Sequence, residues 1–109
     1  MNFYSQLSRH YDEIFAVSEK EMSFIKNRLA GRACLLDLGC GTGNKTEFLA
    51  EENRTVIGLD LDPEMIHLAR KNHTMPGLEY QVADLNDIGR LFPPKSFDGI
   101  VCLGNTLVH

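Results

Sequence analysis

The stretch Leu35-Leu36-Asp37-Leu38-Gly39-Cys40-Gly41-Thr42-Gly43-Asn44 decides the fold of this chain. An apolar run ends there in closely spaced glycines and leads into a segment with a helical pattern. Such a run lets a ligand lie against bare backbone at the carboxyl end of a strand. A second apolar run, 56–60, ends in Asp60, 21 residues after Gly39, where the next strand would present a carboxylate to ribose hydroxyls. The two runs together predict a site for a nucleoside-bearing cofactor.

The spacing of the glycines separates two classes of cofactor. A dinucleotide fingerprint reads G-x-G-x-x-G, and its third glycine allows close helix packing after the pyrophosphate-binding turn. This chain has Gly39, Gly41 and Gly43, and Asn44 stands where that fingerprint requires its third glycine. Asp37 lies just ahead of the loop, where a carboxylate would repel a pyrophosphate but would suit a cationic ligand. An NAD-dependent dehydrogenase is therefore the weaker alternative.

Four ordered motifs resemble the class I S-adenosylmethionine-dependent methyltransferases. The glycine loop of that family carries an acidic residue two positions before its first glycine, as Asp37 does here. The other three motifs follow at compatible spacings, and together the four span most of the chain from Ala33 to its end. The motifs are Asp37-Leu38-Gly39-Cys40-Gly41-Thr42-Gly43, Gly58-Leu59-Asp60-Leu61-Asp62-Pro63-Glu64-Met65, Val82-Ala83-Asp84-Leu85 and Phe97-Asp98-Gly99-Ile100-Val101-Cys102.

This resemblance implies S-adenosyl-L-methionine as the cofactor and gives several residues a role. Asp60 would bind the ribose, Leu61 would lie under the adenine, and Asp84 would accept a hydrogen bond from the adenine amino group. The backbone carbonyl of Leu103 would accept the methionyl ammonium. The cofactor contacts expected in this way are Asp37, Gly39, Cys40, Gly41, Gly43, Asp60, Leu61, Asp84, Leu85, Leu103 and Tyr11.

Four of these residues also have a plain structural interpretation. Asp60 could cap a neighbouring helix as a strand-end carboxylate, and Asp84 could cap the turn that follows it. Asp37 could either brace the glycine loop by accepting backbone N–H groups or contact the methionyl ammonium. Tyr11 lies in an N-terminal segment that folds over the cofactor in many related enzymes, and could equally be a half-buried helix residue.

The remaining pattern predicts an α/β chain in which strands and helices alternate. Ser18 and Glu21 form a capping box for a helix that Gly31 ends. Asn44 with Glu47 starts a second helix. Asp62 can cap a third whose first position is Pro63, with Met65, Ile66 and Ala69 on its buried face. The predicted strands are 33–38, 56–60, 78–83 and 100–103.

Right-handed crossovers through the intervening helices would place these strands in the order three, two, one, four. The third strand is the most polar, because Tyr80 and Gln81 interrupt it, and it is expected at the sheet edge. The expected fold is a Rossmann-like doubly wound parallel sheet, apparently truncated after the fourth strand. That strand would then expose an edge, so we expect either self-association through it or a longer polypeptide whose remainder covers it.

Composition narrows the class of protein. The 109 residues form at most one small domain, divided into an N-terminal helical segment, 1–32, which could act as a lid, and an incomplete cofactor-binding core, 33–109. A net charge of -4 without a Lys/Arg cluster argues against nucleic-acid binding. No run approaches a membrane span. The histidines show no metal spacing, so no metal site is expected. The cysteines form no C-x-x-C pair, which favours a reduced, cytoplasmic protein.

The acceptor is less well specified than the cofactor. Gly104-Asn105-Thr106-Leu107-Val108-His109 resembles the corresponding segment of small-molecule N-methyltransferases of the glycine and sarcosine type. The expected function is therefore methyl transfer to a small-molecule acceptor, with an amine as one candidate. A cofactor-binding module or fragment without catalysis is the alternative. No general base can be named from the sequence.

Overall fold

The computed structural model describes residues 15–16, 22–93 and 95–103. Each of the four predicted strands is present, with both ends within one residue of the prediction. The elements are β1 (Phe15–Ala16), α2 (Met22–Arg28), β2 (Cys34–Leu38), the 3-10 helix η2 (Thr46–Leu49), β3 (Thr55–Asp60), α3 (Pro63–Asn72), β4 (Leu78–Val82), the 3-10 helix η3 (Leu85–Asp87), α4 (Ile88–Leu91) and β5 (Gly99–Cys102).

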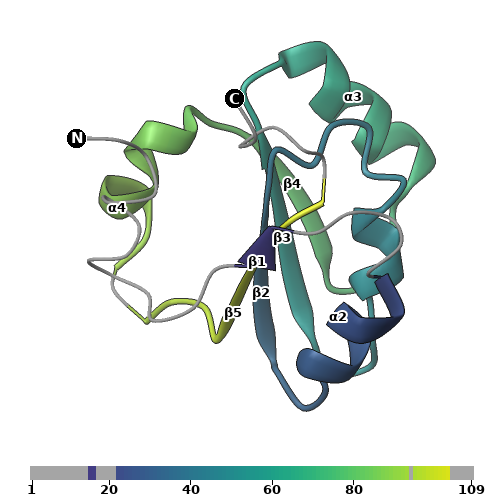
Figure 1. The fold of residues 1–109 in the computed structure, drawn as a ribbon. Helices are drawn as coiled ribbons and strands as arrows, with labels where there is room; N and C mark the ends of the chain where they lie inside the picture. The colour runs from purple at the N-terminus through teal and green to yellow at the C-terminus, as the bar shows by residue number, and fades with distance from the viewer. Residues whose placement is uncertain (1–14, 17–21, 94, 104–109) are drawn as a thin grey trace.

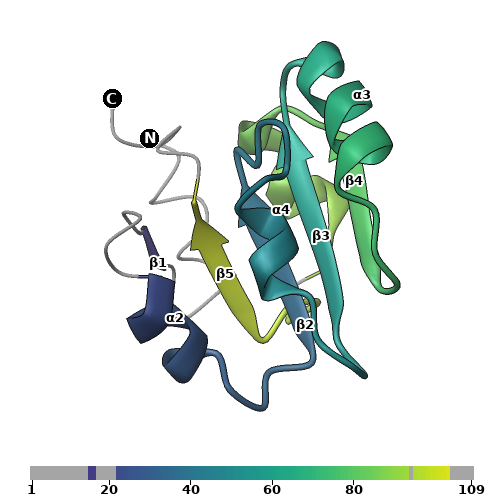
Figure 2. The same cartoon turned by 90° about the vertical axis from the view of Figure 1, so that its right-hand side faces the viewer.

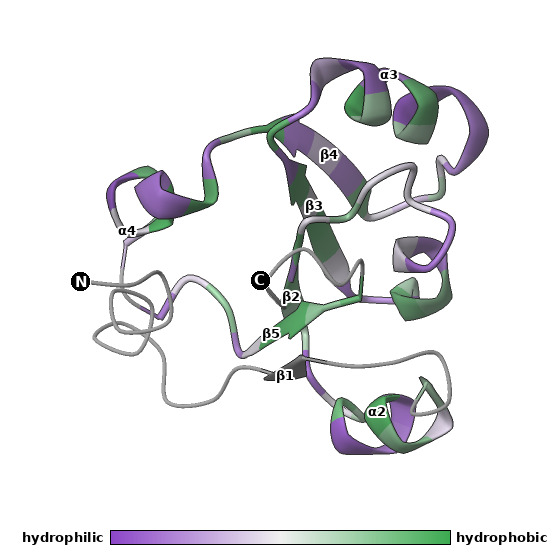
Figure 3. Cartoon of the chain, turned by 45° about the horizontal axis from the view of Figure 1, so that its top comes forward, coloured by the Kyte–Doolittle hydropathy of each residue, from purple (hydrophilic) through white to green (hydrophobic). Residues whose placement is uncertain are grey.

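The strands form one parallel sheet in the order β1-β5-β2-β3-β4 (Figures 1 and 2). The predicted order of the four main strands is therefore confirmed, with β2 in the centre. Asp37 on β2 stands in register with Gly58 on β3 and with Val101 on β5. The prediction that the third strand lies at the edge is also confirmed, and Figure 3 shows β4 to be largely hydrophilic while β3 and β5 are hydrophobic.

The strand β1 corrects one expectation. Phe15 and Ala16 pair in parallel with Val101 and Cys102 of β5, so the edge that we expected to be exposed is covered at these residues by the chain itself. Backbone groups of an edge strand are available for pairing, and a preceding segment of the same chain reaches them here. The expectation of a helical segment over 1–32 is wrong at these two residues, and the argument for self-association through β5 is weakened.

Helices cover both faces of the sheet. Helices α2, η2 and α3 lie on one face and α4 lies on the other (Figure 1). Because successive side chains of a strand point to opposite faces, Leu35 packs toward Ile25 and Leu29 of the α2 layer, while Leu36 packs toward Ile88 of α4. All five of these side chains are almost fully buried. This two-sided burial explains the nearly continuous apolar runs of the central strands.

One helix begins where the sequence predicts, and another is shorter than predicted. The start of α3 is as predicted, because the Asp62 side chain accepts a hydrogen bond from the backbone N–H of Glu64 at 2.9 Å and Pro63 takes the first position. Its residues Ile66 and Ala69 are buried as expected, whereas Met65 is only half-buried. The second predicted helix is shorter than expected. It is the single 3-10 turn η2, and it ends because Ala50 adopts an extended conformation.

Candidate cofactor site

The glycine loop, residues 39–43, follows β2 directly and holds left-handed backbone conformations that only glycine adopts readily. Gly41 and Gly43 have φ angles of +60° and +81°. A Cβ atom on Gly43 would also lie 2.7 Å from the hydroxyl oxygen of Tyr80. The loop is held by backbone hydrogen bonds, among them one from the N–H of Cys40 to the carbonyl of Leu59 at 2.9 Å. It therefore has a fixed shape against the end of β3.

Asp60 joins the glycine loop to the end of β3. One carboxylate oxygen accepts from the backbone N–H of Gly41 at 2.8 Å, and the other accepts from the N–H of Asp62 at 2.9 Å. A carboxylate has about four lone-pair sites, so both oxygens keep capacity for ribose hydroxyls. The side chain is half-buried. The structural interpretation of Asp60 is therefore correct in part, and it is compatible with the ribose-binding role.

The residues expected around the adenine lie beside Asp60. Leu61 is 65% exposed, so its apolar side chain is accessible to a ligand. The backbone N–H of Ala83 donates to the carbonyl of Asp60 at 3.0 Å, which brings Asp84 to the same edge of the sheet. Asp84 caps η3 by accepting from the N–H of Asn86 at 2.9 Å, while Leu85 packs partly into the core. An apolar surface and a carboxylate thus meet next to the glycine loop.

Asp37 is fully buried beneath the loop. Its two oxygens accept from the hydroxyl of Thr46 at 2.6 Å and from the backbone N–H of Leu103 at 3.2 Å. Burial raises the pKa of Asp37 to about 7, in spite of these hydrogen bonds and the nearby charge of Lys45, which lower it. Of the two roles left open by the sequence, the structure supports the bracing one, although the donors are Thr46 and Leu103 rather than the glycine loop itself.

Leu103 lies directly after β5, across the sheet from Asp60. Its side chain is buried, and its carbonyl accepts from the Nζ of Lys45 at 3.4 Å. The carbonyl that was expected to bind the methionyl ammonium is thus in contact with an ammonium group of the protein. Lys45 and Leu103 belong to the two sides of the crevice between β2 and β5, where ligands bind in open α/β sheets.

The glycine loop is supported from below by Tyr80 and Cys40. Both side chains are buried in one cluster with Ile66, and the Tyr80 hydroxyl donates to the carbonyl of His73 at 2.9 Å. Burial raises the pKa of the Cys40 thiol and of the Tyr80 hydroxyl. Because the Cys40 side chain points into this cluster, its expected contact with a cofactor is left to its backbone.

The comparisons with known proteins agree with this geometry. A family model described as a methyltransferase domain matches residues 35–109. The chain is 38% identical over 69 residues to a fatty-acid O-methyltransferase of Mycolicibacterium smegmatis, a match covering 62% of this chain and 24% of that protein. It is 30% identical over 73 residues to the 18S rRNA (guanine-N(7))-methyltransferase of Schizosaccharomyces pombe, covering 67% of this chain and 26% of that protein.

A solved structure matches as well. An amino pentose methyltransferase from Micromonospora echinaspora, determined with S-adenosylmethionine bound, aligns with a TM-score of 0.59 and 30% identity over 94% of this chain and 42% of its own. The chain belongs to the class I S-adenosylmethionine-dependent methyltransferase family. The chain spans about a quarter of the length of the two curated methyltransferases that it matches.

Three residues of this candidate site escaped the sequence analysis: Lys45, Thr46 and Tyr80. Tyr80 was interpreted as a polar interruption of the third strand, yet it is 3% exposed. The available signal was Gly58, a glycine inside a strand, where a Cβ would lie 2.9 Å from the Tyr80 ring. Nothing local marked Thr46 or Lys45, because their partners lie 9 and 58 residues away. Tyr11 lies outside the described residues.

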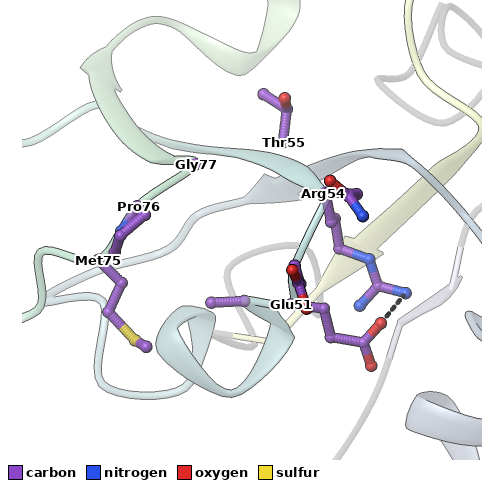
Figure 4. A pocket seen from close by; sticks show the side chains of 9 residues that line it. Glu51, Arg54, Thr55, Met75, Pro76 and Gly77 are labelled. Atoms are coloured by element: carbon purple, nitrogen blue, oxygen red, sulfur yellow. Dashed lines mark ion pairs between the residues drawn. The ribbon is translucent and has the colours of Figure 1, made fainter.

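An open cavity lies at the opposite end of the strands from the glycine loop (Figure 4). It has a volume of about 750 Å³ and is lined by residues 50–55 and 75–77, at the amino ends of β3 and β4. The six residues of β3 put it roughly 17 Å from Asp60. Arg54 there pairs with Glu51 at 3.2 Å and donates to the carbonyls of Leu29 and Leu49 at 2.8 Å. We interpret this end of the sheet as structural.

Proposed function

We propose that this protein transfers a methyl group from S-adenosyl-L-methionine to a small-molecule acceptor. The observation that carries the proposal is the junction of Asp60 with the backbone N–H of Gly41, beside the exposed side chain of Leu61. That junction offers a carboxylate, bare backbone and an apolar surface within one edge of the sheet. A ribose, an amino-acid chain and an adenine require these three features in this combination.

The described residues around this junction have the chemistry that each part of the cofactor requires. Asp60 would hold the ribose hydroxyls, and Leu61 would pack against the adenine. Asp84 would accept the adenine amino group with the capacity that its bond to the N–H of Asn86 leaves. The glycine loop would lie along the ligand through its backbone, and Leu85 would complete the apolar surface.

Bound S-adenosylmethionine supplies a methyl group on a positively charged sulfur, which an aligned nucleophile can accept directly. The chain's residues are left with the tasks of orienting both partners and excluding water, which can contribute several kcal/mol to lowering the barrier. Little acid–base help is required for a nucleophile that is already deprotonated.

The proposed class of acceptor rests on the net charge of the chain and on one segment of its sequence. The matched proteins are named for acceptors as different as a fatty acid, a guanine of rRNA and an amino pentose. The net charge of -4 favours a small molecule over a nucleic acid. Small amines are the first acceptors to test because the segment 104–109 resembles that of small-molecule N-methyltransferases; it lies outside the described residues.

None of the helices in the described part of the chain has the length and apolar character needed to cross a membrane. With three free cysteines, we propose a cytoplasmic location.

The sequence left two rival functions open. The family match decides against a nicotinamide-dependent dehydrogenase, whereas a binding module without catalysis would share the whole cofactor site. We expect S-adenosylhomocysteine to raise the thermal midpoint of the protein while NAD and NADP leave it unchanged, since a ligand that binds only the native state stabilises it. Binding of NAD without a response to S-adenosylhomocysteine would overturn the proposal. Methyl transfer to a panel of small amines, carboxylic acids and phenols then separates an enzyme from a binding module.

A further inference from the structure

Lys45 stands at the point where the glycine loop ends and η2 begins. Its Nζ reaches over the crevice between β2 and β5 and donates to the carbonyl of Leu103. At 3.4 Å this hydrogen bond is longer than the usual range of roughly 2.7–3.2 Å, so a charged acceptor at normal distance would bind Nζ more strongly than this carbonyl does. Figure 2 shows β2 lying between β3 and β5, so this contact and Asp60 flank the glycine loop on opposite sides.

That arrangement fixes which end of the cofactor meets Lys45. If Asp60 holds the ribose at the end of β3, the remainder of the molecule would extend over the glycine loop toward β5. This remainder is the methionyl group, which ends in an ammonium and a carboxylate. The ammonium has an acceptor in the carbonyl of Leu103. The carboxylate needs a donor, and the nearest charged donor shown there is Lys45.

The buried Asp37 offers the cofactor no surface to contact. Both of its oxygens are already engaged, by Thr46 and by the N–H of Leu103, and the side chain has no exposed surface. With its pKa raised to about 7, Asp37 is also partly protonated at neutral pH. Partial protonation of Asp37 therefore reduces the negative charge beneath the crevice, and a cation at its mouth can attract an anionic group.

We propose that Lys45 binds the carboxylate of the methionyl group and thereby selects cofactors that carry one. The inference rests on the proposed function. On binding, Nζ exchanges the carbonyl of Leu103 for the carboxylate, and that carbonyl becomes available to the methionyl ammonium. Lys45 is then a specificity-determining residue for the amino-acid end of the cofactor, as Asp60 is for its ribose.

The test compares two ligands that differ only in this group, S-adenosylmethionine and its decarboxylated form. Dissociation constants are measured by calorimetric titration for the unmodified protein, Lys45→Gln and Lys45→Arg. Lys71→Gln serves as the control because Lys71 is an exposed lysine in the last turn of α3. We expect Lys45→Gln to bind S-adenosylmethionine about tenfold more weakly, since a charge-assisted hydrogen bond is lost. Its affinity for the decarboxylated ligand should be unchanged or higher.

Lys45→Arg should keep most of the discrimination between the two ligands, and Lys71→Gln should leave it intact. An equal loss of affinity for both ligands would mean that Lys45 only shapes the loop, and this would overturn the inference. Unchanged affinity for both would overturn it as well. Failure of the unmodified protein to bind either ligand would refute the proposed function itself, and this inference with it.

Discussion

Replacing Asp37 by asparagine should change how the stability of the protein depends on pH. Asparagine has nearly the same shape as aspartate, and its amide can keep both contacts. Its oxygen can accept from the N–H of Leu103, and its nitrogen can donate to the hydroxyl of Thr46, reversing the direction of that hydrogen bond. The substitution therefore removes an ionisable group from the core while leaving the packing almost unchanged.

The magnitude follows from the pKa of Asp37, which burial raises from 3.8 to about 7. The native state then binds more protons than the unfolded state between these two values, so the contribution of Asp37 to stability falls as pH rises through this window. It is most favourable below pH 4 and reaches its least favourable level above pH 7. A difference of about three units corresponds to about 4 kcal/mol in total, of which roughly 2 to 3 kcal/mol falls between pH 5 and pH 8.

The assay is urea unfolding of the unmodified protein and of Asp37→Asn at pH 5 and at pH 8. Other titrating groups, including the histidines, are the same in both proteins and cancel in the comparison. We expect the free energy of unfolding of the unmodified protein to fall by roughly 2 to 3 kcal/mol more than that of the variant over this range. Parallel pH profiles for the two proteins would refute the reasoning, because they would mean that Asp37 is ionised at low pH in the native state.

Substitutions at Asp60 and at Gly43 test the proposed ribose contact and the support of the glycine loop. Asp60→Ala should weaken the binding of S-adenosylhomocysteine by roughly 10- to 100-fold in calorimetric titration, with a milder effect for Asp84→Ala; Asp62→Ala is the control, costing about 1 kcal/mol of stability through the lost cap of α3. Unchanged affinity in a folded Asp60→Ala protein would leave Asp60 a purely structural role. Gly43→Ala should lower the thermal midpoint, because its Cβ would lie 2.7 Å from the Tyr80 hydroxyl and because alanine is strained at a φ of +81°. An unchanged midpoint would contradict both reasons.

The sequence alone determined the fold class and the order of the four main strands, and it predicted a cofactor site at the carboxyl ends of these strands. These features depend on local patterns that the chain carries within a few residues, such as apolar runs, glycine spacing and the Asp62-Pro63 cap. Handedness of the crossovers then leaves a single arrangement of the strands. The resemblance of the four motifs supplied the family, which the match over residues 35–109 shows.

The details of the site depended on contacts between distant parts of the chain. The role of Asp37 stayed open in the sequence because both of its donors, Thr46 and Leu103, come from segments that the fold alone brings to it. The strand β1 was missed for a related reason. Two residues carry no periodic signal, and their conformation is set by the edge of β5 that they cover.

The role of Tyr80 is the clearest example of a feature that only the tertiary structure decides. In the sequence it is a polar residue in an edge strand, whereas in the structure it fills the space above Gly58 and supports Gly43 from below. Local sequence fixes backbone conformation because turns, caps and strand patterns act over short distances. Burial and hydrogen bonding of a side chain depend on what the whole sheet places opposite it, and only the tertiary structure decides that.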